Sequence, residues 1–200
     1  DDGRTSGKRR PPARGKQTLA LFAFTSGILT LTEAGTKRRA ALHLFESLDS
    51  LQKLDRGGLE PLEVDPAAFN EALRRENHTL KRFLTDPRLI SGIGNAYSDE
   101  ILHRAGLSPF KQSQQISEEE ARRLFSATQQ VLSEWIARLR EQAGDAFPSR
   151  VTAFRPEMAV HGKYNTPCPV CGNPVQRIRY AENECNYCAT CQTGGALLAD

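Results

Sequence analysis

The chain has 200 residues, enough for one large domain or two small ones with a sizeable core. Hydrophobic residues make up 38% and charged residues 26%, as in an ordinary soluble globular protein, and the net charge of +3 permits a nucleic-acid partner without requiring one. No apolar run approaches the roughly 20 residues of a membrane helix, and no secretory signal is visible. All five cysteines lie within residues 168–191, as C-x-x-C pairs rather than spread as in a disulfide scaffold. We therefore expect a cytoplasmic protein with no membrane partner.

The N-terminal part predicts β-structure preceded by a flexible segment. Residues 1–17 are rich in Gly, Pro, Arg and Lys, which indicates a basic arm or loop. Apolar and β-branched residues in 18–32 flank a turn at Thr25–Gly27 and predict a hairpin, and Leu42–Phe45 predicts another strand. Because a lone hairpin is rarely stable, we expect residues 18–64 to be the last strands of a larger β-domain plus a linker. The chain begins without Met, and we expect both ends to be cut from a longer protein.

Residues 65–150 change to a helical period and predict a helical domain. Asp65 and Pro66 fit the N-cap and the first position of a helix. That helix is expected to run to residue 85, with an apolar face interrupted near residues 76–78.

Two more helices are expected in this domain. Gly106 fits the residue that follows the first of them. Ser117 and Glu120 form a capping box that opens the other, which ends at Gly144. Trp135 lies on the apolar stripe of this last helix, so it is predicted to pack in the core.

The cysteines predict a metal-binding ribbon in residues 151–200. Two C-x-x-C knuckles, separated by the 16 residues 172–187, are typical of a tetrahedral site with four thiolate ligands: Cys168, Cys171, Cys188 and Cys191. Cys185 also makes a C-x-x-C pair with Cys188, but that frame leaves Cys191 alone. We predict one structural Zn²⁺, with an iron–sulfur centre as the alternative. The knuckles would frame a two-stranded hairpin with a turn around Ala181–Glu184.

The loop before the second helix predicts an anion site. Gly92 and Gly94 in "SGIGN" allow close approach of the backbone, and the N-terminus of the following helix favours a phosphate. Asn95 can add its amide, and Lys81 is a candidate phosphate contact. The alternative is a simple tight turn and a solvated lysine.

Other polar residues allow two interpretations each. Asp99 and Glu100 suit an acid–base pair or an interaction with the helix dipole, and we favour the dipole. His78 and His103 lack ligand spacing. His161 precedes the first cysteine by seven residues and could compete as a ligand, although four cysteines suffice.

The combination of helix, G-I-G-N loop, helix and terminal four-cysteine ribbon resembles one family. The stretch "ENHTLKRFLTDPRLISGIGNAYSDEILHRAGLSP" is similar to the helix–two-turn–helix (H2TH) core of the formamidopyrimidine-DNA glycosylase / endonuclease VIII (Fpg/Nei) family. The stretch "MAVHGKYNTPCPVCGNPVQRIRYAENECNYCATCQ" looks like its zinc finger. The resemblance covers residues 65–195, and residues 18–46 resemble the end of its N-terminal β-sandwich. The implied fold is α+β: a β-sandwich remnant, an H2TH domain and a C-terminal zinc-ribbon hairpin.

The resemblance implies base-excision repair by a monomer of the bacterial cytosol or nucleoid. Such proteins bind damaged double-stranded DNA, flip the lesion out and remove an oxidised base. They then nick the abasic site through a Schiff base formed by an N-terminal proline amine. This chain begins with Asp1 and Asp2 instead of Pro-Glu. No catalytic residue is therefore identified, and we expect this chain alone to be inactive.

The resemblance also implies which residues touch DNA. The positions that match the family's H2TH contacts are Gly92, Gly94, Asn95, Lys81 and Tyr97. At the ribbon turn, Asn183 stands where the family usually has an arginine that grips the phosphates beside the lesion. An asparagine cannot make the bidentate, charge-assisted bonds of an arginine. Arg177 or Arg179 is a candidate replacement.

Two other function classes compete with the enzyme. One is a non-catalytic, zinc-dependent DNA-binding protein with the same fold and no nucleophile. The other is a zinc-ribbon protein with RNA or protein partners, against which the G-I-G-N loop argues. The sequence does not choose between oxidised purines and oxidised pyrimidines as the lesion.

Overall fold

A computed structural model describes residues 15, 17–33, 39–146, 152, 154–180 and 183–198, without the side chain of Asn183. The chain divides into two compact units, Asp1–Leu51 and Gln52–Asp200. The helical segment and the ribbon, which the sequence separates near residue 150, therefore pack together in one unit. No helix within the described ranges is long and apolar enough to cross a membrane.

The first unit contains the predicted hairpin. Strands β1 (Thr18–Ala23) and β2 (Ile28–Thr32) pair antiparallel, and the Phe24 N–H donates to the Gly27 carbonyl at 2.8 Å across the turn. The predicted strand at Leu42–Phe45 is wrong: residues 39–47 are irregular, and the short helix α1 (Leu48–Leu51) follows. Two leucines of this stretch are largely exposed and pair with no strand. That the hairpin is the end of a β-sandwich stays a prediction.

The second unit begins with a close backbone contact. After the 3-10 turn η1 (Gln52–Leu54), the Leu59 N–H donates to the Leu89 carbonyl at 3.0 Å, and the Leu59 carbonyl accepts the Ser91 N–H at 2.9 Å. At Gly58, a Cβ would stand 2.5 Å from the Pro87 carbonyl oxygen, so any side chain would collide with backbone.

The single helix expected over residues 66–85 is two helices, α2 (Pro66–Arg75) and α3 (Leu80–Thr85). Asp65 caps α2 as predicted, and Thr79 caps α3. The non-helical segment between α2 and α3 is stabilised by a buried serine, Ser113 in the 3-10 turn η2 (Ser113–Gln115). Its hydroxyl donates to the Glu76 carbonyl at 2.9 Å and accepts the His78 N–H at 3.2 Å. The apolar face is interrupted near residues 76–78 because these residues form a non-helical segment between two helices.

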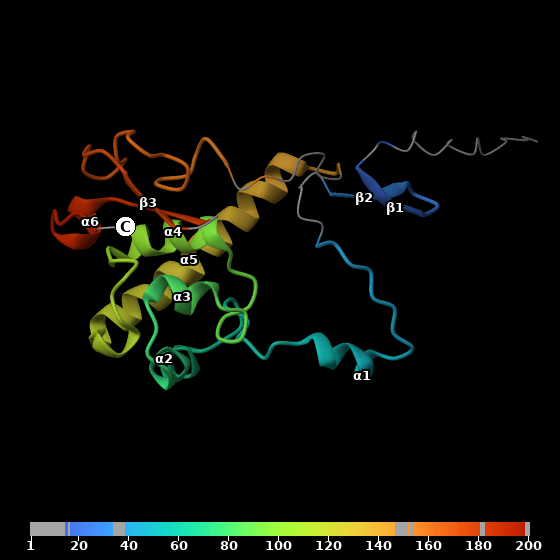
Figure 1. Cartoon of the computed structure of the whole chain (residues 1–200), viewed down its shortest axis with the longest axis horizontal. Helices are drawn as coiled ribbons and strands as arrows, with labels where there is room; N and C mark the ends of the chain where they lie inside the picture. Colours follow the sequence, from blue (N-terminus) through green and yellow to red (C-terminus); the bar gives the residue numbers. More distant parts are fainter. Residues whose placement is uncertain are drawn as a thin grey trace, which may run out of the picture. The chain divides into compact units, whose positions relative to one another are not determined.

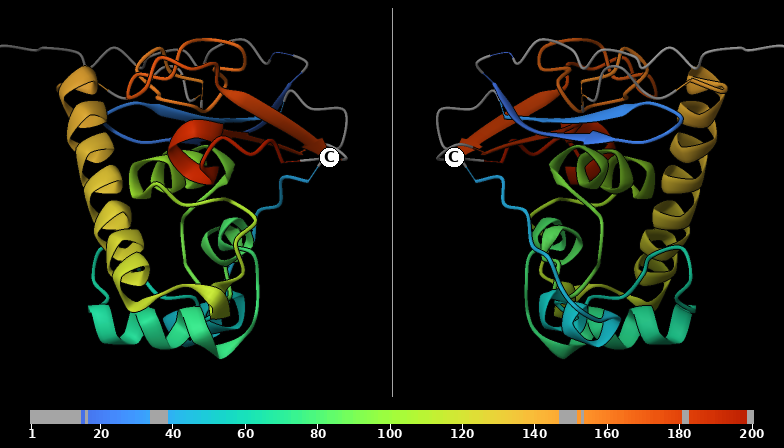
Figure 2. Two further views of the ribbon diagram at one scale, coloured as in Figure 1. Left: turned by 90° about the vertical axis from the view of Figure 1, so that its left-hand side faces the viewer. Right: turned by 90° about the vertical axis from the view of Figure 1, so that its right-hand side faces the viewer.

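Helix α4 (Asn95–Ala105) is the centre of the unit, and the 26-residue α5 (Glu118–Ala143) runs along one side of it (Figures 1 and 2). The αL conformation of Gly106 ends α4 as predicted, with φ of 64°. The helices bury one apolar core, in which Trp135 packs as predicted. Its largest fully buried members are Phe69, Leu73, Leu80, Phe83, Leu84, Ile90, Ile101, Leu102 and Leu124.

The predicted capping box of α5 is present and gives a direct test of the helix start. Ser117 Oγ accepts the Glu120 N–H, and the Glu120 carboxylate accepts the Ser117 N–H at 2.9 Å. Replacing Ser117 with Ala should lower the free energy of unfolding by about 1 kcal/mol, because a backbone donor loses its partner. Denaturant titration measures this. Ser133→Ala, at an exposed mid-helix position, is the matched control and should leave stability unchanged or slightly higher.

The ribbon lies directly against α4 (Figure 1). Strands β3 (Gln176–Tyr180) and β4 (Asn183–Tyr187) pair antiparallel, and the short helix α6 (Ala189–Thr193) follows. Residues 183 and 184 of the predicted turn belong to β4, and residues 181 and 182 lie outside the described part of the chain. Ile178 and Tyr187 are buried beneath the hairpin, partly against Phe110.

Candidate metal centre and nucleic-acid interface

The four predicted cysteines come together. The Sγ atoms of Cys168, Cys171, Cys188 and Cys191 all lie within 4.8 Å of one another. The first knuckle is a tight turn: the Gly172 N–H donates to the Cys168 carbonyl, and Gly172 has φ of 76°, which a residue with a side chain adopts at a cost. The second knuckle is the first turn of α6, where the Gln192 N–H donates to the Cys188 carbonyl at 3.0 Å. Four convergent sulfurs on two turns fit a tetrahedral ion with thiolate ligands, so this cluster could hold a metal.

The proton affinities within this cluster differ. A hydrogen bond from the Asn173 backbone lowers the pKa of the Cys171 thiol to about 6. Burial, and then the neighbouring cysteine sulfurs, raise the pKa of Cys191 well above its ordinary value. Burial and repulsion between the sulfurs therefore disfavour four thiolates together. A divalent metal supplies the positive charge that stabilises them.

Cys185 stands apart from these ligands, as predicted. It lies on β4 opposite Ile178, is fully buried, and burial raises its thiol pKa to about 12. Cys185 is therefore a protonated core side chain at neutral pH. His161, the other candidate ligand, turns away from the cysteines and contacts the Asp99 carboxylate at 2.9 Å through Nδ1.

The glycine loop presents the N-terminus of α4. Gly92 has φ of 74°, both glycines are exposed, and a Cβ on either would meet nothing within 4 Å. Gly94 is the N-cap, and no side chain among the described residues caps this helix. The first N–H groups of α4 therefore point outward without a side-chain acceptor. They border a pocket of about 600 Å³ that also includes Asn95, Tyr97 and Glu184.

Asn95 connects this loop to the ribbon. Its Nδ2 donates to the Glu184 carbonyl of β4 at 2.8 Å, so the amide already has a protein partner, while a second N–H remains on the same nitrogen. Tyr97 packs edge-to-face on Trp135 with 5.9 Å between ring centroids, and burial raises its hydroxyl pKa. The loop and the hairpin thus form one continuous surface.

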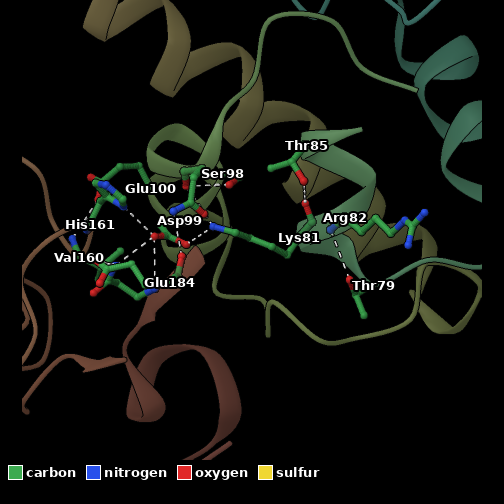
Figure 3. A network of polar contacts seen from close by, with 12 residues as sticks. Thr79, Lys81, Arg82, Thr85, Ser98, Asp99, Glu100, Val160, His161 and Glu184 are labelled. Carbon is green, nitrogen blue, oxygen red and sulfur yellow. Dashed lines mark hydrogen bonds and ion pairs between the residues drawn. The ribbon is translucent and has the colours of Figure 1, made fainter. Parts of the chain in front are cut away.

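Lys81 lies beneath this surface rather than on it. Its side chain is 5% exposed; Nζ forms an ion pair with Asp99 and donates to the Asn95 carbonyl at 3.0 Å (Figure 3). The solvated-lysine alternative is therefore wrong. Direct contact of Lys81 with a phosphate stays a prediction, and the ammonium would have to leave these partners to make it.

Asp99 and Glu100 do not interact with the helix dipole, and that interpretation is wrong. Both residues lie beyond the first turn of α4 and are buried. Besides Lys81 and His161, Asp99 accepts the Asn186 N–H of β4 at 3.2 Å. Glu100 accepts three consecutive backbone N–H groups, those of Ala159, Val160 and His161, at 2.8–2.9 Å (Figure 3). The hydrogen bonds of these two carboxylates join α4 to the ribbon and to the segment before it.

His103 completes this face of α4. Its Nε2 lies 3.2 Å from Cys168 Sγ, and burial lowers the imidazole pKa. Residues 95, 99 and 103 recur every fourth position, so they share one side of the helix. That repeat is visible in the sequence, but a polar stripe is ordinarily a solvated one, and sequence reasoning missed its role.

The arginines of the ribbon have partners of their own. The Arg177 guanidinium lies 4.2 Å from the centre of the Tyr164 ring and 3.9 Å from the Glu184 carboxylate. Arg179 lies 4.0 Å from the same carboxylate, with a side chain that is 67% exposed. The Asn183 side chain is outside the described part of the structure. Its role at the turn stays a prediction.

Comparison with known proteins gives the chain its relatives. A family model, the formamidopyrimidine-DNA glycosylase H2TH domain, matches residues 58–144. An uncharacterized formamidopyrimidine-DNA glycosylase-like protein of Mycobacterium tuberculosis is 38% identical over 143 residues, 72% of this chain and 89% of that protein. The formamidopyrimidine-DNA glycosylase of Thermus thermophilus is 40% identical over 147 residues, 69% of this chain and 54% of that protein. This chain thus spans about half the length of that glycosylase.

Solved structures agree with these matches. The crystal structure of MutM (Fpg) from Thermus thermophilus superimposes with a TM-score of 0.69 at 31% identity, covering 90% of this chain and 70% of that one. Lactococcus lactis Fpg in complex with DNA containing N7-benzyl-Fapy-dG gives 0.61 at 27% identity, covering 73% and 55%. The match to the H2TH family model, the four clustered cysteines and the similar proteins all indicate the same family. The chain belongs to the Fpg/Nei family of DNA glycosylases.

Proposed function

We propose that this chain is the DNA-binding part of a base-excision-repair glycosylase and AP lyase, and that its partner is damaged double-stranded DNA. The observation that carries the proposal is the N-terminus of α4, where the N-cap Gly94 offers no side-chain acceptor to the first N–H groups, and which Asn95 joins to the ribbon hairpin. Backbone donors at a helix N-terminus are a phosphate site, and the hairpin beside them extends the same surface. Gly92 and Tyr97 border it, and Lys81 supports it from below.

Zinc is the metal that suits this proposal. Four thiolates without an open coordination position are typical of a structural Zn²⁺, which would hold the knuckles and orient the hairpin. The role of the cysteines is then to shape the DNA-binding surface, and no step of the chemistry passes through the metal.

The chemistry itself is assigned to the family and not to a residue of this chain. In the proposed reaction an amine attacks the sugar of the flipped nucleotide and forms a Schiff base, which replaces attack by water. No described residue is placed in that role. For these 200 residues we expect DNA binding without a borohydride-trapped adduct on abasic DNA.

A non-catalytic DNA-binding protein is the second candidate. The observation that favours it is the Mycobacterium tuberculosis relative, because the segment matching this chain makes up 89% of that protein. Borohydride trapping decides between the two when it is run on the protein with its native N-terminus. A trapped adduct supports the enzyme, and DNA binding without an adduct supports the second candidate.

A charge placed at Gly94 should test the phosphate site without loss of folding. Gly94 has φ of −101°, and a Cβ there meets nothing within 4 Å. Asp is a preferred N-cap, so Gly94→Asp should preserve or raise stability. We expect it to weaken binding to an abasic-site duplex about tenfold or more at low salt, because a carboxylate replaces the phosphate at the N–H groups. Fluorescence anisotropy across a salt series measures the affinity.

The matched control is Gly94→Asn, a neutral cap of the same shape. It should bind more tightly than Gly94→Asp and retain most of the salt dependence of the parent chain. Equal affinity of the parent and the Asp variant would contradict the phosphate site at α4. Binding of the parent chain that does not change with salt would contradict phosphate recognition altogether.

A further inference from the structure

The imidazole of His103 makes a contact that the four-cysteine site does not need for ligation. His103 lies near the C-terminal end of α4 and is 8% exposed. Its Nε2 lies 3.2 Å from Cys168 Sγ, within hydrogen-bond range for sulfur. The four sulfurs already supply as many ligands as a tetrahedral site needs, and His103 is outside the group of mutually close ligand atoms found in the described residues. The imidazole therefore contacts a ligand and not the metal position.

The chemistry of a bound thiolate decides the direction of this hydrogen bond. A cysteine sulfur that coordinates a metal has lost its proton and can only accept. The proton between the two atoms must then belong to the imidazole, which fixes the tautomer with N–H at Nε2. A donated N–H fixes the position of the sulfur and stabilises its negative charge, as outer-shell partners of metal ligands do.

The placement of His103 connects two sites. It shares one face of α4 with Asn95 and Asp99, which bond to Glu184 and Asn186 of the ribbon. This face therefore contacts the ribbon at its hairpin strand and at its first metal knuckle. The contact at Cys168 joins the helix to one of the proposed metal ligands.

We propose that His103 is an outer-shell positioning residue of the metal site, which donates its Nε2–H to the Cys168 thiolate, slows metal loss and ties the first knuckle to α4. The inference rests on the proposed zinc site. Metal content of the unsubstituted chain, measured first, tests that site separately: a chain that takes up no zinc refutes the site, whereas the measurements below concern His103 alone.

Two substitutions separate the hydrogen bond from packing. His103→Phe keeps a ring of similar size and removes the donor, and His103→Gln keeps an N–H donor on a side chain of similar reach. We expect the Phe chain to hold zinc about 10- to 100-fold more weakly in competition with a chromogenic chelator. The Gln chain should recover most of that loss. In the cobalt-substituted proteins, the sulfur-to-cobalt charge-transfer band should move to lower energy in Phe and return in Gln.

The matched control is His78→Phe, because His78 contacts Glu76 and lies on a segment without cysteines. It should leave zinc affinity and the cobalt band unchanged. If Gln and Phe weaken zinc binding equally, or if neither moves the band, His103 only packs and the proposal is wrong.

A measurement on the unsubstituted chain decides the case even where the Phe variant does not fold. After loading with an NMR-active cadmium isotope, the imidazole nitrogen shifts should report a neutral ring protonated at Nε2. That proton should exchange slowly and show a coupling to cadmium across the sulfur. A ring protonated only at Nδ1, or an Nε2 proton without the coupling, would overturn the proposal.

Discussion

Removal of the metal should unfold the ribbon and leave the helical core folded. The ribbon buries few apolar side chains of its own: Val160 and Val175 around the cysteines, and Ile178 and Tyr187 beneath the hairpin. A structural zinc contributes about 10–16 kcal/mol of apparent binding free energy at neutral pH, which a core of this size does not replace. Helices α2 to α5 keep a separate apolar core. We expect the amides of β3 and β4 to lose hydrogen-exchange protection after chelation while those of α5 retain it.

Two cysteine variants make this prediction specific to ligation. Cys171 is only partly buried, so Cys171→Ser removes a ligand with little loss of packing and should reproduce the effect of chelation. Cys185→Ala is the matched control. It removes a fully buried thiol from β4 and should still retain one equivalent of metal. Protected β3 and β4 amides in the metal-free chain would contradict the structural role of the metal.

Loss of the Asp99 carboxylate should destabilise the helical core strongly. Asp99→Asn leaves the Lys81 ammonium buried without its counter-charge and weakens the contact with His161. Removing one partner of a buried ion pair costs about 3–5 kcal/mol, because an uncompensated charge remains away from water. We expect a fall of that size in the free energy of unfolding of the metal-loaded chain, measured by denaturant titration.

An exposed ion pair gives the control for this prediction. Arg104 and Glu134 are 45% and 51% exposed, so Glu134→Gln should change stability by less than about 1 kcal/mol. The double variant Lys81→Met/Asp99→Asn should be more stable than Asp99→Asn alone, since the unpaired charge is gone. An Asp99→Asn chain that loses no more stability than Glu134→Gln would show that the buried pair is not needed.

The parts that could be predicted from the sequence are those governed by local rules. The capping box at Ser117, the αL glycine at Gly106 and the two cysteine knuckles each depend on a few neighbouring residues, and each is present. The break between α2 and α3 depends on Ser113, more than 30 positions away, so no local pattern reveals it.

The polar face of α4 could not be predicted for a related reason. Asn95, Asp99, Glu100 and His103 form the spacing of a solvent-facing stripe, and only the tertiary structure covers that stripe with a ribbon. Burial of such groups is tolerable because their hydrogen bonds are made within the protein. A sequence pattern records polarity but not what lies opposite it. For the same reason Lys81, a plausible surface residue by sequence, is an interior one.

The close contact at Gly58 fixes the start of the helical unit against the segment that leads into Gly92. Leu59 is bonded on both sides to the segment that leads into Gly92, so residue 59 and that segment move together. The chain enters this bridge through Gly57, whose φ of 77° lies in the left-handed region that favours glycine. The backbone that precedes the Gly92–Asn95 loop is therefore held by contacts within the helical unit itself. Replacing Gly58 with a larger residue would therefore disturb the segment before the glycine loop as well as the bridge at Leu59.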